Sequence, residues 1–182
     1  GDAAPGAIAY FIAALREAFE ETGLLVGITG EGASALAAGQ DPAVARVRDR
    51  LLEDEIGFAV ALEELGVELD GEAVEYVAHW ITPVQERRRY DTRFFAAAVA
   101  RDREVLLHPA EMTDSRWLTP SAALELHGRG DLPMVFPTIR TLEDLQGFES
   151  VAAALGAFSA KAIPTILPKL IRTPTGVGLQ VP

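Results

Sequence analysis

The chain of 182 residues has 49% hydrophobic residues, no cysteine and a formal net charge of −11, from 16 basic and 27 acidic side chains. This length and hydrophobic content favour one folded domain, the charge argues against a nucleic-acid-binding surface, and the lack of cysteine excludes disulfides and thiolate metal sites. No apolar run approaches the ~20 residues of a membrane span, so we expect no membrane partner. The lack of cysteine fits a cytoplasmic protein, and the negative charge favours a small molecule or another protein as the partner.

The first predicted element is a helix at residues 6–22, which Gly23 is placed to end. One face of this helix carries apolar residues at helical spacing: Ile8, Phe11, Ile12, Leu15 and Phe19. Glu17, Glu20 and Glu21 share the opposite face in the last turns, where the helix dipole disfavours negative charge. The three acids form either a solvated face, the commoner case, or a site for a divalent cation that offsets the charge.

The next stretch begins with a short buried strand at residues 24–26 and continues as a block that we predict to be helical, residues 30–72. Asp41 followed by Pro42 is a helix start signal. Two apolar stripes follow at helical spacing, and Gly66 ends the second. We interpret residues 30–72 as a helical insertion in a single domain that spans residues 1–182.

From residue 73 the apolar period changes to two, which is typical of strands. We predict strands at residues 74–81 and 87–99, and a turn at 101–103 that leads to a partner strand at 104–107. A further short strand is predicted at residues 113–118.

The last third is predicted to be mostly helical. Thr119-Pro120 is the start signal of a helix at residues 121–126. Residues 141–144 resemble a capping box, and the apolar stripe that follows predicts a helix as far as Leu155. Four prolines after residue 163 argue against another long helix, so we expect edge strands at residues 166–171 and 177–181.

The end of the first helix carries a specific motif. Its sequence, Arg16-Glu17-Ala18-Phe19-Glu20-Glu21-Thr22-Gly23-Leu24, resembles the core of the Nudix box, Arg-Glu-U-x-Glu-Glu-x-Gly-U with U aliphatic, at every fixed position. The usual box also has a glycine and a glutamate upstream, where this chain has Asp2 and Ile8. Either the chain begins after that half of the box, or an insertion separates the two halves.

Later stretches of the chain are similar to one branch of the Nudix family, which includes the peroxisomal coenzyme A diphosphatases and bacterial relatives. These stretches are residues 79–83, 88–95, 117–124 and 137–138. The resemblance implies an α/β (α+β) fold, the Nudix α/β/α sandwich around a mixed sheet, with the helical insertion described above. It also implies that about 40 to 60 residues with the first strands precede Gly1, because a packed sheet would still need them.

The resemblance assigns the glutamates a metal-dependent role, with Mg²⁺ or Mn²⁺ as the expected cofactor. Glu20 and Glu21 are then the strongest metal ligands, and Glu17 is a ligand or the base that orients the attacking water. Arg16 is expected to pair with a nearby acid. In the family an acid from a later loop often completes the site, and Glu111 is our candidate.

Other candidates are weighed against ordinary structural roles. Glu104 is a second choice for the later acid. Arg88, Arg89 and Arg93 are expected either to grip diphosphate oxygens or to form ion pairs with the acidic surface. His79 is predicted to be a packed histidine rather than a base. The tryptophans, Trp80 and Trp117, are predicted to lie in the core.

Two classes of function stay open. The first is a hydrolase that cleaves the diphosphate linkage of nucleoside-diphosphate derivatives, with coenzyme A or acyl-coenzyme A as one substrate. The second is a non-catalytic Nudix-fold module that binds such a nucleotide. A homodimer is a further expectation, because homodimers are common in the family.

Overall fold

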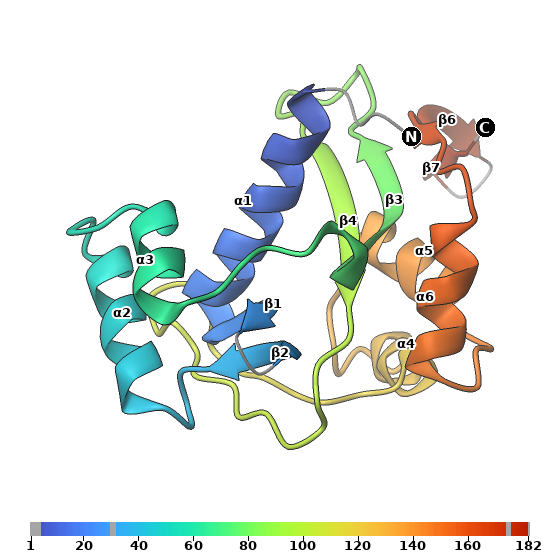
Figure 1. Ribbon diagram of the computed structural model, residues 1–182. Coiled ribbons are helices and arrows are strands. Elements are labelled where there is room, and N and C mark those ends of the chain that lie inside the picture. Colours follow the sequence, from blue (N-terminus) through green and yellow to red (C-terminus); the bar gives the residue numbers. More distant parts are fainter. Residues whose placement is uncertain (1–4, 30–31, 174–175, 182) are drawn as a thin grey trace. The chain divides into compact units, whose positions relative to one another are not determined.

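The computed structural model describes residues 5–29, 32–173 and 176–181, and the chain forms two compact units (Figure 1). The first unit is Gly1–Val74 with Ala97–Trp117, and the second is Glu75–Ala96 with Leu118–Pro182. Within the described residues, no helix is both long and apolar enough to span a membrane.

The first unit begins with helix α1 (Pro5–Thr22), which ends at Gly23 as predicted. Gly23 has a φ of +72°, and a side chain at this position would crowd Ala38 and Leu106 at 3.1–3.3 Å. The position therefore requires glycine both for its backbone conformation and for the close approach of its neighbours.

Strand β1 (Leu24–Thr29) confirms the predicted strand and pairs antiparallel with β2 (Gly32–Ala37), with Leu24 opposite Ala37. The prediction that this part of the block is helical is therefore wrong for residues 32–37, and residues 30 and 31 lie outside the described residues. This stretch is made of small residues without a clear period, so pairing with β1 decides its conformation rather than local preference.

Helices α2 (Pro42–Leu52) and α3 (Phe58–Leu65) confirm the two helices predicted inside the block. Residues 67–70 are not helical, because Glu68 exchanges backbone hydrogen bonds with Ile28. The Asp41 carboxylate accepts a hydrogen bond from the Ala43 amide at 2.7 Å, and Gly66, with a φ of +61°, ends α3. A single core joins these helices to α1 and β1, and its buried members are Phe19, Leu25, Ala38, Val44, Leu51 and Val67. Figure 1 shows the α2–α3 pair beside the C-terminal part of α1.

The second segment of the first unit, Ala97–Trp117, does not form the strands predicted at 104–107 and 113–118. The amides of Leu106 and His108 instead donate to carbonyls of α1, so they do not form a ladder with another strand. The prediction that Trp117 lies in the core is also wrong, because its side chain is 65% exposed.

The second unit contains the three-stranded sheet β4-β3-β5, in which β3 (Val74–Ile81) is central. The strands beside it are β4 (Asp91–Ala97) and the short β5 (Thr165–Ile166), which is parallel to β3. A short 3₁₀ turn (Gly71–Ala73) precedes β3. Trp80 on β3 is 4% exposed, which confirms its predicted place in the core.

The remaining helices are α4 (Pro120–Gly128), α5 (Phe136–Leu145) and α6 (Val151–Ser159). Thr119 caps α4 as predicted, through a 3.2 Å hydrogen bond from the Ala122 amide. The single helix predicted from Thr141 to Leu155 is wrong: the Thr141 hydroxyl donates to Pro137 O inside α5 instead of capping a new helix.

Two elements complete the second unit. Strands β6 (Lys169–Thr173) and β7 (Gly176–Gln180) pair antiparallel, in agreement with the edge strands predicted after the prolines. Gly147, with a φ of +98°, lies between α5 and α6, where the predicted continuous helix is interrupted.

Candidate active site

The carboxylates of Glu17, Glu20 and Glu21 lie on the last two turns of α1, as the sequence predicts. Glu17 is exposed, Glu21 is partly buried, and the Glu20 side chain is 24% exposed. Arg16 Nε lies 3.5 Å from the Glu20 carboxylate, so the predicted pairing of Arg16 with an acid is confirmed.

The end of α1 is held by the loop that follows β4. A helix leaves its last four carbonyls without helical partners. Two of these are Glu21 O and Thr22 O, which accept hydrogen bonds of 2.9 Å from the amides of His108 and Leu106. The loop at residues 105–112 is thereby fixed against the helix end that carries the glutamates.

The other two carbonyls have different donors. Phe19 O accepts hydrogen bonds from the Gly23 amide and from Arg48 Nε, both at 2.9 Å. Glu20 O accepts from Arg48 Nη2 at 2.6 Å and from Arg48 Nε at 3.2 Å. All four terminal carbonyls of α1 are thus paired, which keeps the last turn helical.

Glu111 is brought close to the glutamates of α1 by the same loop. Its amide donates to His108 O in a tight turn, and its side chain is exposed. Burial is the largest cause that raises the pKa of the Glu21 carboxyl, and the charge of Glu111 is the second. The charges of Glu17 and Glu20 add to this rise, whereas His108 opposes it.

Glu21 is expected to make the metal-free protein less stable as the pH rises. Its raised pKa means that the folded state keeps a proton that the unfolded state has already lost. The resulting stabilisation is complete below the unfolded pKa and is lost as the pH rises through the folded pKa. Between about pH 4 and pH 7, the free energy of unfolding of the wild type should fall relative to that of Glu21→Gln, measured by urea titration in EDTA. A constant difference between the two proteins across this range would contradict the assignment.

The carboxylates of Glu17, Glu20, Glu21 and Glu111 suit a hard divalent cation, because such ions prefer oxygen ligands. A bound cation would also remove the repulsion between these negative charges. In the part of the chain that the structure describes, no three acidic or histidine side chains are already arranged to hold a metal ion. Glu20 is turned toward Arg16, and its carboxylate would have to leave that ion pair to bind a metal.

Glu104, the second candidate for the later acid, directly precedes this loop and is held through its backbone. Its amide donates to Gln40 Oε1 at 3.4 Å, and a side chain at Gly39 would lie 2.9 Å from Glu104 O. The charge of Glu111 is one of the causes that raise the pKa of Glu21, whereas the charge of Glu104 is not. Glu111 is therefore the better placed of the two acids.

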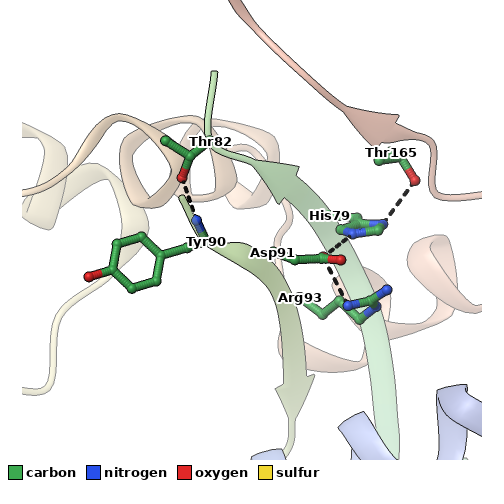
Figure 2. A network of polar contacts seen from close by, with 6 residues as sticks. All are labelled: His79, Thr82, Tyr90, Asp91, Arg93 and Thr165. Carbon is green, nitrogen blue, oxygen red and sulfur yellow. Dashed lines mark hydrogen bonds and ion pairs between the residues drawn. The ribbon is translucent and has the colours of Figure 1, made fainter. Parts of the chain in front are cut away.

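The predicted substrate-binding arginines all lie in the second unit. Arg93 Nη1 donates to Asp91 Oδ1 at 2.9 Å (Figure 2). Arg89 Nε donates to Thr82 O at 3.1 Å. Arg88 is exposed on the turn between β3 and β4. The Arg93 contact is an ion pair with Asp91, whereas Arg89 contacts a backbone carbonyl. The substrate-binding role of the three arginines stays a prediction.

His79 links all three strands of the sheet in the second unit, and it is 8% exposed. Its Nε2 lies 2.5 Å from Asp91 Oδ1 on β4, and its Nδ1 lies 2.9 Å from Thr165 Oγ1 on β5 (Figure 2). The ring is therefore enclosed between two hydrogen-bond partners, as expected of a packed histidine.

Replacing His79 by Ala should destabilise the protein by about 1–3 kcal/mol, because Asp91 and Thr165 lose a buried partner. Thr165→Val removes one of the two hydrogen bonds and should cost about 1 kcal/mol. Urea unfolding of both variants would measure the difference. Equal effects of the two substitutions would show that the Asp91 contact contributes nothing.

A comparison with known families decides the identity of the fold. The family model described as the NUDT19 Nudix domain matches residues 1–145. The chain belongs to the Nudix family. The predicted family and its branch are thereby confirmed. We call α1 the Nudix helix, because it carries the motif at residues 16–24 that resembles the Nudix box.

Similar proteins agree with this family. Acyl-coenzyme A diphosphatase NUDT19 of Homo sapiens is 30% identical over 159 residues, which cover 81% of this chain and 42% of that protein. The protein of the same name from Gallus gallus is 31% identical over 166 residues, covering 83% and 44%. The chain thus spans less than half the length of these curated relatives.

The structure resembles a solved Nudix protein as well. The crystal structure of a NUDIX hydrolase from Alicyclobacillus acidocaldarius has a TM-score of 0.67 and 27% identity, covering 88% of this chain and 71% of that chain. This similarity confirms the predicted α/β Nudix fold.

Sequence reasoning missed two residues that hold the Nudix helix. The sequence analysis predicts no role for Arg48, although this residue follows Val44 by four positions and therefore lies on the apolar face of its helix. A charged residue on that face was the available signal. His108 carried no signal, because its contact with Glu21 uses the backbone amide.

Proposed function

We propose that this protein is a divalent-metal-dependent hydrolase that cleaves the diphosphate linkage of nucleoside-diphosphate derivatives. One observation carries the proposal: the intact glutamate set of the Nudix helix lies at a helix end against which the loop with Glu111 is fixed. The relatives named acyl-coenzyme A diphosphatase support coenzyme A or its acyl derivatives as the substrate class.

The chemistry explains why carboxylates are needed. A diphosphate ester resists attack at neutral pH because its own negative charge repels a nucleophile. Bound Mg²⁺ or Mn²⁺ supplies charge neutralisation and a water of lowered pKa. Phosphoryl transfer depends on positioning and charge more than on covalent chemistry, which suits a site made of acids.

Each acid has a proposed role in this site. Glu20 and Glu21 would hold the metal ion, and Glu17 would either join them or orient the attacking water. Glu111, whose charge acts on Glu21, would accept the proton of that water or complete the ligand set. The proton that burial and neighbouring charges favour on Glu21 would leave when the metal ion binds.

Arg88, Arg89 and Arg93 stay predicted contacts for diphosphate oxygens, and all three belong to the second unit. Arg89 and Arg93 already donate to Thr82 and Asp91, so they would have to exchange these partners for substrate. Arg88 lies exposed on a turn, and a guanidinium can contact phosphate oxygens through two parallel hydrogen bonds.

The proposal is tested with coenzyme A, acetyl-coenzyme A, ADP-ribose, NADH and a diadenosine polyphosphate, each with Mg²⁺, Mn²⁺ or EDTA. Cleavage of coenzyme A should give 3′,5′-ADP and phosphopantetheine, and EDTA should abolish it. Tight binding of a nucleotide without turnover under every condition would favour the alternative, a non-catalytic binding module. The cytoplasmic location and the homodimer stay predictions, for fractionation and light scattering to test.

A further inference from the structure

Arg48 connects the helical insertion to the end of the Nudix helix. It lies on α2, its side chain is buried and the residue is 3% exposed. Its guanidinium donates to two successive carbonyls, Phe19 O through Nε and Glu20 O through Nη2 and Nε. The two elements it joins are 28 to 29 residues apart in the sequence.

The acceptors explain why a charged side chain is tolerated at this buried place. Arginine is almost never fully buried unless it has a partner. The carbonyls at the end of a helix carry the negative pole of its dipole and lack helical donors. The Arg48 guanidinium therefore stabilises the helix end through the backbone and caps two carbonyls at once.

The place of these contacts gives them a functional meaning. Phe19 is fully buried in the core, whereas Glu20 and Glu21 are the next two residues and carry proposed metal ligands. Helix ends fray when their carbonyls are unpaired, and the direction of each Cα–Cβ bond depends on helical backbone angles. Among the residues that the structure describes, the amides of Gly23, Leu106 and His108 are the donors that would remain for the last turn without Arg48.

We propose that Arg48 is a positioning residue, which holds the last turn of α1 so that Glu20 and Glu21 present their carboxylates together to a divalent cation. This inference rests on the proposed metal-dependent function. It gives the helical insertion a part in the site, although the insertion contributes no proposed ligand.

The test compares Arg48→Met and Arg48→Lys with Arg46→Met in the full chain. Arg46 is exposed on the same helix, so its variant controls for the loss of one positive charge. Two quantities are measured without substrate: the Mn²⁺ dissociation constant by calorimetry, and amide hydrogen exchange of residues 20–23 in metal-free protein.

Arg48→Met should weaken Mn²⁺ binding by roughly tenfold and speed exchange at residues 20–23, because residues that orient metal ligands typically have effects of this size. Arg48→Lys should show an intermediate loss, since a single ammonium cannot reproduce the forked contact with two carbonyls. Arg46→Met should match the wild type in both measurements.

A folded Arg48→Met protein with wild-type Mn²⁺ affinity would overturn the inference, as would an equal loss in Arg46→Met. If Arg48→Met does not fold, Arg48→Lys decides, and unchanged Mn²⁺ affinity in that variant would also overturn it. A wild-type protein that binds no Mn²⁺ would instead contradict the proposed function itself, and the role of Arg48 with it.

Discussion

Replacing Glu20 by Gln is expected to lower kcat by roughly 100-fold or more, which corresponds to about 3 kcal/mol of transition-state stabilisation. The amide keeps the shape of the side chain and its place on the last turn of α1, but it removes the charge that the cation needs. Steady-state hydrolysis of the best substrate with Mn²⁺, at saturating metal, measures the loss in kcat. If the loss in kcat disappears when the Mn²⁺ concentration is raised further, the substitution has weakened metal binding alone.

The matched control for this substitution is Glu63→Gln, since Glu63 is an exposed acid on α3. It removes the same charge from the same unit without touching the Nudix helix, and it should keep the wild-type kcat. If Glu20→Gln retains full activity while the wild type is active, the site assignment is wrong.

Replacing Phe19 by Ala is expected to destabilise the protein by about 3–5 kcal/mol. Phe19 is 0% exposed and packs in the core with Leu25 and Val44, so the substitution leaves a cavity that the surrounding elements cannot fill. Urea unfolding followed by circular dichroism measures the loss.

Ile8→Ala is the comparison for Phe19, because Ile8 lies on the same helix and is 53% exposed. Its cost should stay within about 0.5 kcal/mol, as for most surface substitutions. A cost for Phe19→Ala as small as that of Ile8→Ala would contradict the central place of Phe19 in the core.

The sequence predicted those elements whose cause is local. The ends of α1 and α3 follow from Gly23 and Gly66, which adopt the left-handed conformation that glycine favours. The starts of α2 and α4 follow from Asp41 and Thr119, whose side chains accept from amides two and three residues later. In each case the signal and the contact lie within one turn of chain.

The sequence failed where the partner is distant. Residues 32–37 form a strand because β1 is beside them, and their own small side chains give no period. The loop around Leu106 forms no strand because its amides donate to helix carbonyls more than 80 residues earlier. A hydrogen bond to a backbone carbonyl does not depend on the type of side chain, so the spacing of apolar residues does not predict it.

In the candidate site, too, local features could be predicted from the sequence and contacts with distant residues could not. The spacing of Glu17, Glu20 and Glu21 places them on one helix face, and this much follows from the helical period. The closeness of Glu111 to Glu21 depends on how the later loop is fixed, and the resemblance to the family was needed to propose it. Arg48 donates to backbone carbonyls of α1, so its place on the apolar face of its helix indicated a buried charge but not the partner.

The hydrophobic cluster shared by α1, β1 and the α2–α3 hairpin limits how this protein can be shortened. Val44 and Leu51 on α2 belong to the same buried set as Phe19 and Leu25. Excising the hairpin would expose these rings and methyl groups to solvent, so any relative without it must cover that surface with other side chains. In this chain the hairpin thus supports α1 through the shared core and cannot be removed like a surface loop.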